Sequence, residues 1–281
     1  MKKIFSLMTI LFITANLSAG TITLENGTLV NGSFEQIFLP SGVSDLKVWI
    51  DLSSSDYVNV VGGDVETAYD RSINGINLVG PFGKRPDYLI AAQNGLNVQS
   101  HPTLRYLTIE SNVAGILNGT DAEMSVFIVF KVDSTPITGR LFQLGTTTNS
   151  NPDIKCFKIY MGSNGIYNIF CLDDSGTTPY TSAVSGGTID FTDYHVMVVR
   201  KGNTVTNNFD FWVDGVQIDS STVRTTTFTN MDKGAIGAQR WYDSSGGEFR
   251  GKVGECAVYT KYLSDQEVIE LSNYAIDKWG L

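Results

Sequence analysis

The clearest alternation of hydrophobic and polar positions in the chain runs from residue 191 to residue 218. Residues 194–200 are rich in valine and bounded by turn formers, which is typical of a strand. The next strand, 209–213, alternates between two faces: Phe209, Phe211 and Val213 on one, and Asp210, Trp212 and Asp214 on the other. Asp214-Gly215 favours a hairpin turn, because both central positions of a type I′ turn need positive φ, and Val216 and Ile218 begin a returning strand. The pattern predicts antiparallel β-structure with one dry face and one wet face.

Similar patterns recur along the rest of the chain, with turn formers every eight to twelve residues or so. The run 124–132 is almost continuously apolar, as for a strand covered on both faces. Trp49, within the strand predicted at 46–52, is expected to point inward. This spacing favours an all-β sandwich or jelly roll, with further strands predicted at 58–61, 65–69, 96–98, 104–109, 140–144, 235–238 and 249–259. Asn94-Gly95 is a turn signal that introduces the strand at 96–98.

One helix is predicted, at the end of the chain. Ser264 is a suitable N-cap and Glu267 follows three residues later, which is the capping-box arrangement. Gly280 ends the helix, after Lys278 in its last turn. The expected apolar stripe consists of Val268, Ile269, Leu271, Ala275 and Ile276.

The N-terminus has the pattern of a secretory signal peptide. Lys2 and Lys3 precede an apolar run at 4–13, and Ser18-Ala19-Gly20 offers small residues for cleavage. The alternative is an uncleaved anchor, although the run is short for a membrane span. We therefore expect residues 1–20 to be a signal peptide, residues 21–44 a short extension with Asn-Gly turns at Asn26 and Asn31, and residues 45–281 one domain of a protein that is secreted or held at the cell surface.

Charge limits the partners of the mature chain. The formal net charge is −9, and removal of the signal peptide takes away two lysines and no acids, which lowers it to −11. A chain this acidic is repelled by nucleic acid and by anionic membrane surfaces. A neutral glycan or a cell-surface protein fits better, with no membrane insertion once the signal is removed. The oligomeric state stays open.

Three cysteines are present, at Cys156, Cys171 and Cys256. The first two flank a predicted hairpin. With Ser163-Asn164 as its central residues they lie directly opposite each other and could form a disulfide, whereas a turn at Asn164-Gly165 separates them. Two free thiols are the alternative. Cys256 lies in an apolar run and is expected in the core, and none of the spacings resembles a zinc site.

Several stretches together resemble a known family, the bacterial and viral laminin-G-like domains of the concanavalin A-like lectin/glucanase superfamily. In chain order they are LKVWIDLSSSDYV, VETAYDRSINGINL, RPDYLIAAQNGLNV, MSVFIVFKV, DYHVMVVRKG, FDFWVDGVQI, GAIGAQR and EFRGKVGECAVYTKYLSDQEVIELSNYAIDKWGL. The resemblance spans about residues 45–281, with one departure: Tyr194 stands where the family often has Trp before the His of the central strand. It implies an all-β, two-sheet antiparallel jelly-roll sandwich, concanavalin A-like, with one short C-terminal helix. The superfamily includes lectins, glucanases, lyases and adhesive domains, so the fold alone does not give the function.

No catalytic arrangement of residues is recognisable in the sequence. Retaining glycosidases need two carboxylates about 5 Å apart, but the Glu-x-Asp-x-x-Glu string that glucanases of this fold carry is missing. Glu248 and Glu255 are seven residues apart, which puts them on opposite faces of a regular strand. The Gln-x-His strand of the lyases is matched neither at His101 nor at His195, and no nucleophile elbow is present. We therefore predict no catalytic residues.

Glycan binding needs an exposed aromatic ring flanked by amides, carboxylates or cations. The best candidates are Arg240, Trp241, Tyr242 and Asp243, in a polar, glycine-rich loop with no periodic reason for burial. One aromatic could instead cover the end of the sandwich. Trp212, on the polar face of its strand, is a further candidate, or lies under another strand or loop. Calcium is the one cofactor considered, because the loops 149–153 and 173–175 are rich in oxygen ligands, although neither has a calcium-loop order.

Three hypotheses follow. The first is a secreted, non-catalytic carbohydrate- or cell-surface-binding module. The second is a structural or adhesive subunit of a surface layer, an appendage or a virion, with no sugar site. The third is a polysaccharide-active glycosidase or lyase.

Overall fold

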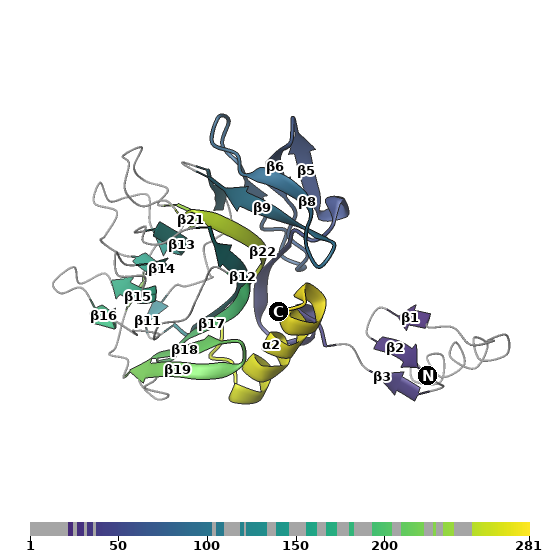
Figure 1. Ribbon diagram of the computed structural model, residues 1–281. Helices are drawn as coiled ribbons and strands as arrows, with labels where there is room; N and C mark the ends of the chain where they lie inside the picture. The colour runs from purple at the N-terminus through teal and green to yellow at the C-terminus, as the bar shows by residue number, and fades with distance from the viewer. Residues whose placement is uncertain are drawn as a thin grey trace. The chain divides into compact units, whose positions relative to one another are not determined.

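The computed structural model divides the chain into two compact units, 1–39 and 40–281 (Figure 1). The residues that it describes are 22–24, 27–30, 33–35, 38–102, 105–109, 119–120, 122–133, 139–145, 156–161, 167–172, 180–182, 193–203, 209–221, 227–228, 233–238 and 249–281. In unit 1, three short antiparallel strands, β1 (Ile22–Leu24), β2 (Gly27–Val30) and β3 (Ser33–Glu35), lie on either side of the predicted turns.

Unit 2 is built around an antiparallel sheet that runs β19–β18–β17–β12–β22–β4. Its long central strand β22 pairs with β12 on one side and with β4 on the other. We call it the first sheet; its strands are β4 (Leu46–Asp51), β12 (Met124–Val132), β17 (His195–Lys201), β18 (Phe209–Val213), β19 (Val216–Ser221) and β22 (Gly251–Tyr259).

A second set of antiparallel strands runs β16–β15–β14–β13–β21–β10–β7–β6–β5. We call it the second sheet; its strands are β5 (Val58–Val61), β6 (Asp64–Ala68), β7 (Leu78–Val79), β10 (Leu107–Ile109), β13 (Gly139–Gly145), β14 (Cys156–Met161), β15 (Tyr167–Leu172), β16 (Tyr180–Ser182) and β21 (Lys233–Ile236). The hairpin of β8 (Asp87–Gln93) and β9 (Leu96–His101) joins the two sheets, because β9 pairs with β22 and β8 meets β6. The described elements also include the pair β11 (Gly119–Thr120) and β20 (Thr227–Phe228), and two 3-10 turns, η2 (Pro40–Gly42) and η3 (Ser55–Tyr57).

The main core lies between the inner faces of these two sheets. Alternate residues of β12 and β18 point into it, among them Ile128 and Phe211, and meet residues of β13 and β14 such as Phe142 and Phe157. Both faces of β12 are covered, as its apolar sequence predicts. The fold is thus the mostly antiparallel, concanavalin A-like jelly-roll sandwich expected from the sequence.

The outer face of the first sheet is covered by α2 (Asp265–Trp279), which crosses it as a third layer (Figure 1). The Tyr274 ring packs on Phe127, with ring centroids 6.5 Å apart. The indole of Trp279 lies against Gly254, where a Cβ would sit 2.6 Å from the ring. The wet face predicted for β18 is therefore wrong at Asp210 and Trp212, which are 1% and 6% exposed because the C-terminal segment packs over them, whereas the Asp214 side chain is 37% exposed.

The local predictions agree well with the structure. Asn94 and Gly95 both have positive φ at the β8–β9 turn, and so do Asp214 and Gly215 at the β18–β19 turn, as type I′ turns require. Ser264 and Glu267 form both hydrogen bonds of a capping box, and Gly280 closes the helix in the left-handed region. The predicted stripe is wrong at Ile269, which is 37% exposed.

One boundary and one strand register differ from the sequence-based expectation. Unit 2 begins at Pro40 rather than at residue 45, because Val43 is buried and Pro40 O accepts a hydrogen bond from Tyr259 Oη at 3.2 Å. The β14–β15 register places Cys156 opposite Leu172 and Cys171 opposite Phe157. The disulfide interpretation required the two cysteines to lie directly opposite each other, and in this register they do not. Cys256 is a buried free thiol in the core, as predicted.

Candidate functional site

Four of the five predicted binding residues, Arg240, Trp241, Tyr242 and Asp243, lie outside the described residues, in the segment 239–248. The residues that flank this segment are described. Phe249 N donates to Gly237 O at 2.9 Å, and Gly237 N donates to Leu141 O of β13 at 3.0 Å. The residues on both sides of the segment are therefore joined at one place beside β13, which we call the anchor.

Buried side chains support this anchor. The Phe249 ring makes edge contacts with Phe130, centroids 6.4 Å apart, and with His101, 5.9 Å apart. A Cβ on Gly237, whose φ is +92°, would sit 2.2 Å from His101 Nδ1, so the imidazole requires glycine there. His101 Nδ1 donates to Arg105 O at 2.7 Å, and burial lowers the pKa of His101 to about 4. A neutral, completely buried His101 thus supports the anchor at physiological pH.

Trp212, the fifth predicted residue, lies under another element, which was the alternative considered. The Arg200 guanidinium lies between two rings, 5.0 Å from that of Trp212 and 4.4 Å from that of Tyr262. Arg200 also donates to Asp210 Oδ2 at 2.9 Å and to Asp265 Oδ1 at 2.7 Å. Trp212 therefore belongs to a buried ion-pair cluster that attaches the start of α2 to the first sheet.

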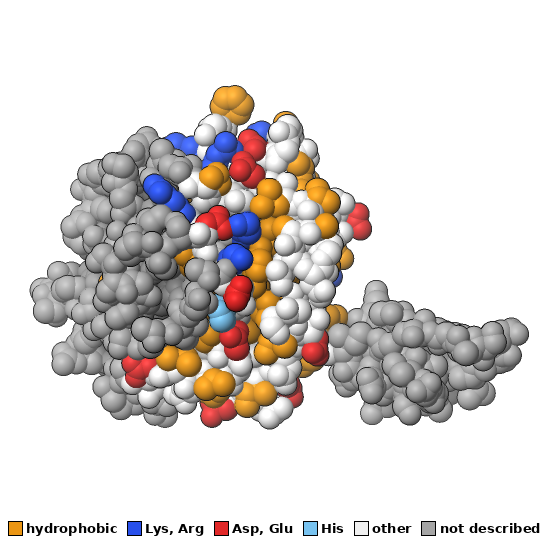
Figure 2. All heavy atoms as spheres, in the orientation of Figure 1, with side chains coloured by type: hydrophobic (Ala, Val, Ile, Leu, Met, Phe, Trp, Pro, Cys, Tyr) orange, Lys and Arg blue, Asp and Glu red, His pale blue; other side chains and the backbone are white. Residues whose placement is uncertain are grey.

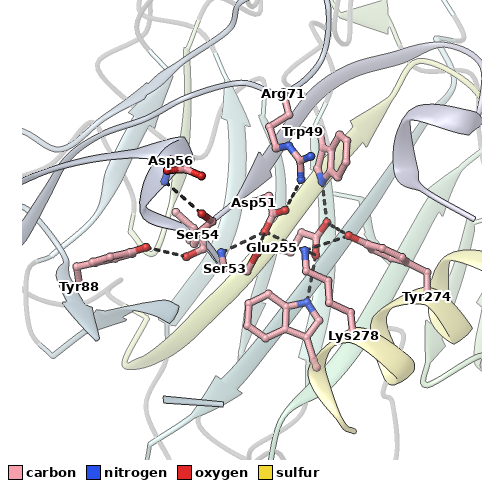
Figure 3. Close-up of polar contacts among 12 residues, drawn as sticks. Trp49, Asp51, Ser53, Ser54, Asp56, Arg71, Tyr88, Glu255, Tyr274 and Lys278 are labelled. Atoms are coloured by element: carbon pink, nitrogen blue, oxygen red, sulfur yellow. Dashed lines mark hydrogen bonds and ion pairs between the residues drawn. The ribbon is translucent and has the colours of Figure 1, made fainter. Parts of the chain in front are cut away.

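Sequence reasoning missed the main polar cluster between the first sheet and α2, which we call the Glu255 cluster (Figure 3). Glu255 of β22 is completely buried. Its carboxylate accepts four hydrogen bonds: from Trp49 Nε1 at 2.6 Å, Tyr274 Oη at 2.9 Å, Lys278 Nζ at 2.9 Å and Trp279 Nε1 at 3.1 Å. Both oxygens are thereby engaged by groups of β4 and α2.

Asp51 of β4 forms the other half of the cluster. It is 2% exposed and shares the Lys278 ammonium with Glu255, at 2.9 Å. Ser53 donates to Asp51 Oδ1 through Oγ at 2.6 Å, and Arg71 pairs with Oδ2. The Arg71 guanidinium, which lies beside Trp49 in Figure 3, is 4.0 Å from the centroid of the Trp49 ring. It is also 4.0 Å from the centroid of the Tyr57 ring. Two carboxylates are thus matched by two cations.

The two carboxylates respond differently to this environment. Burial raises the pKa of Glu255, and the nearby Lys278 only partly offsets it. Burial also acts on Asp51, but Lys278, the Ser53 hydrogen bond and Arg71 together hold the pKa of that carboxyl below its usual range. Neither side chain reaches solvent, whereas a glycosidase carboxylate must reach the glycosidic bond. The cluster holds the helix on the sheet, and Glu255 is not placed for hydrolysis.

The hints that could have revealed this cluster are visible in the sequence. Glu255 lies within the mainly apolar run 253–259, and Asp51 directly follows the apolar residues 48–50. A charge buried in a strand must be paired. The partners could not be predicted, since Trp49 is 206 residues from Glu255.

The described residues bear on two further questions, metal binding and membrane crossing. The oxygen-rich loops 149–153 and 173–175 lie outside them. Among the described residues, no group of three or more His, Cys, Asp or Glu is placed to hold a metal ion. No helix in the described part of the chain is long and apolar enough to cross a membrane.

Comparison with known proteins identifies the family. The chain belongs to the laminin-G-like family described as the concanavalin A-like lectin/glucanases superfamily, whose model matches residues 105–269. The match begins at Arg105, so all the strands from β4 to β9 lie outside it. No match was found among curated proteins.

Three solved structures resemble part or most of the chain. The NanB sialidase of Streptococcus pneumoniae is 22% identical over 58% of this chain, with a TM-score of 0.45, and the chain covers 26% of it. The CBM40 of a Ruminococcus gnavus IT-sialidase, bound to α2,6-sialyllactose, is 20% identical over 54% of this chain and 84% of its own, with a TM-score of 0.44. Domain 4 of AbnA, an extracellular GH43 arabinanase of Geobacillus stearothermophilus in complex with arabinotriose, is 16% identical over 81% and 98%, with a TM-score of 0.46. At these identities the likeness concerns the fold alone.

Proposed function

We propose that this protein is a secreted, non-catalytic carbohydrate-binding module, with its site on the segment that carries Arg240, Trp241, Tyr242 and Asp243. The observation that carries the proposal is the hydrogen bond that joins the residues flanking that segment: Phe249 N donates to Gly237 O at 2.9 Å. The Phe249 ring packs against the buried rings of Phe130 and His101. A polar segment with two aromatics and a fixed base suits stacking on the apolar face of a sugar ring, with the charged groups binding its hydroxyls.

Charge favours a neutral glycan as the ligand. The whole chain carries −9, so an acidic polysaccharide would be repelled. Figure 2 supports a ligand of low charge, since Lys and Arg side chains lie among Asp and Glu side chains on the face shown.

Absence of catalysis is part of the proposal. Glu255, one of the two carboxylates considered for hydrolysis, is occupied by four donors from α2 and β4, and Glu248 lies outside the described residues. Release of reducing sugar from any polysaccharide that the protein binds would overturn this part.

Secretion is also proposed, from the pattern of residues 1–20. N-terminal sequencing of protein recovered from the medium of an expressing bacterium should place cleavage at or next to Gly20. Recovery of uncleaved chain in the membrane fraction would favour the anchor instead.

The central test is a broad glycan panel, probed with purified protein in calcium and then in chelator. We expect a saturable hit on a neutral glycan that Trp241→Ala weakens about tenfold or more. Tyr69→Ala is the matched control, because Tyr69 is an aromatic residue 43% exposed elsewhere on unit 2. Loss of the hit in chelator would add calcium to the site.

A blank panel from folded protein would contradict the proposal. If the same protein also self-associated, the structural or adhesive subunit would replace it.

A further inference from the structure

A second aromatic ring faces solvent on the loop between β7 and β8. Phe82 is 93% exposed. It occupies the tip of a four-residue turn closed by a hydrogen bond from Lys84 N to Pro81 O at 2.9 Å. The third residue, Gly83, has φ +76°, as a type II turn requires. The backbone thus fixes where the ring projects.

The loop is also held at both ends. Gly80 N donates to Glu66 O at 2.8 Å, and Tyr106 N donates to Lys84 O at 2.9 Å. Gly80 is pressed so closely on β6 that a Cβ would lie 2.3 Å from Val65 O. A lone exposed apolar residue is common and needs no explanation. Here the ring is presented on a loop with little freedom to withdraw it, which is the preorganisation that binding rewards.

Polar groups lie beside the ring. The Arg85 guanidinium carbon is 5.8 Å from the Phe82 centroid, and Arg85 pairs with Glu66. Glu66 Oε2 in turn accepts a hydrogen bond from Asn59 Nδ2 at 2.7 Å. We call these four residues, Asn59, Glu66, Phe82 and Arg85, the Phe82 platform. It combines an apolar ring with a guanidinium, a carboxylate and an amide, each in contact with the next.

Cations and carboxylates are paired around the platform. Arg85 is matched by Glu66, and the nearby Arg105 lies 3.2 Å from Asp64 and 3.3 Å from Asp87. At the top of Figure 2, the end of unit 2 with β5, β6 and β8, blue and red side chains interleave and hydrophobic side chains protrude among them. An uncharged ligand therefore fits better than an anion.

We propose that the Phe82 platform is a second glycan-binding site, on which a pyranose ring stacks against Phe82 while its hydroxyls bond to Arg85, Glu66 and Asn59. The site precedes residues 105–269, so family membership does not supply it. The inference rests on the proposed function for the class of ligand, but not for the place where it binds.

The test uses full-length purified protein and three hexasaccharides, of β-1,4-linked glucose, galactose and xylose, titrated by calorimetry. Phe82→Ala should weaken binding of at least one of them about tenfold or more, since the stacking surface is lost. Phe82→Trp should retain binding and report it as a saturable fluorescence change. Ile73→Ala is the matched control, because Ile73 is fully exposed on another turn, and it should bind like the parent. Neither Phe82 nor Ile73 is buried, so all three variants should fold.

A parallel titration of Trp241→Ala separates this inference from the proposed function. Sugar binding that depends on Phe82 and persists in Trp241→Ala supports the second site, whether or not the first site binds sugar. The second site is overturned if Phe82→Ala binds with the parent's affinity and the fluorescence of Phe82→Trp does not change with sugar. If Trp241-dependent binding persists in that case, only the second site is lost. If no sugar binds at all, both sites are lost. A change in sedimentation of Phe82→Ala without any sugar response would make Phe82 a protein contact, and would also overturn the inference.

Discussion

At the scale of single residues, the polar groups under α2 are those whose role was hardest to predict. Asp51 and Glu255 are conspicuous in their apolar strands, but the donors that neutralise them come from β4, from the loop after β6 and from the last turn of α2. A carboxylate on a β-strand is equally compatible with catalysis and with a buried ion pair. Only its exposure and its partners separate the two, and neither is a property of the local sequence.

The Glu255 cluster gives a prediction about stability. Glu255→Gln should lower the free energy of unfolding by about 3 kcal/mol, because it removes one member of a buried charge-paired cluster and leaves an amide among four donors. Urea unfolding followed by tryptophan fluorescence measures the change. Glu270→Gln is the matched control, the same chemical change at a half-buried position of α2 bonded to Gln266, and should cost less than about 0.5 kcal/mol.

The double variant Glu255→Gln, Lys278→Met tests the mechanism, because removing the ammonium as well should recover part of the loss. An unchanged urea midpoint in Glu255→Gln would show that the buried charge contributes nothing to the fold.

At the scale of elements, the predictions that succeeded rest on local chemistry. Asn94-Gly95 and Asp214-Gly215 form turns because their neighbours in the chain suffice to specify them, and the same holds for the caps of α2. The errors arise where a distant element decides. Ile269 has helical spacing but faces solvent. Trp279 is buried because its indole packs directly on Gly254 of β22, which has no side chain. The α2 end is also fixed by Asn94 Nδ2, which donates to Lys278 O at 3.0 Å.

The capping box of α2 makes stability depend on pH. Partial burial raises the pKa of Glu267, but hydrogen bonds from Lys261 and Ser264 outweigh it and hold the pKa below the ordinary value of 4.5. A carboxyl with a lowered pKa stabilises the folded state above its unfolded value, and the contribution is lost as the pH falls through the folded pKa. Glu267→Gln should therefore cost about 1 kcal/mol at pH 7 and progressively less as the pH falls below about 4.

Urea titrations of parent and Glu267→Gln between pH 7 and pH 3 check this expectation. Ser264→Ala should cost a similar amount at pH 7, because it removes the other half of the box. A difference between parent and Glu267→Gln that stays constant over the whole range would show that the ionised carboxylate is not what the cap needs.

At the scale of the whole molecule, the resemblance predicted the class of fold but not the order of its layers. The sequence of β22 shows a long buried strand, yet nothing in it indicates that one half pairs with β9 and the other with β4. The candidate site has the same limit. The binding residues 240–243 were chosen by composition and stay a prediction, whereas the Phe82 platform depends on residues from β5, β6 and the loop after β7 that only the fold brings together.

The layered arrangement predicts unequal effects of trimming the two ends. Deleting residues 264–281 removes α2, exposes the apolar outer face of the first sheet around Trp49 and Phe127, and strips Lys278 from Asp51 and Glu255. We expect this variant to lose its cooperative unfolding transition and to bind a hydrophobic dye, because both buried carboxylates lose a cation and the sheet loses its cover. Deleting residues 1–39, a separate compact unit, is the matched control and should leave the urea midpoint of the remainder within experimental error. If a chain without α2 still unfolds cooperatively at the parent midpoint, the two-sheet sandwich is stable without the helix, and the Glu255 cluster does not contribute to its stability.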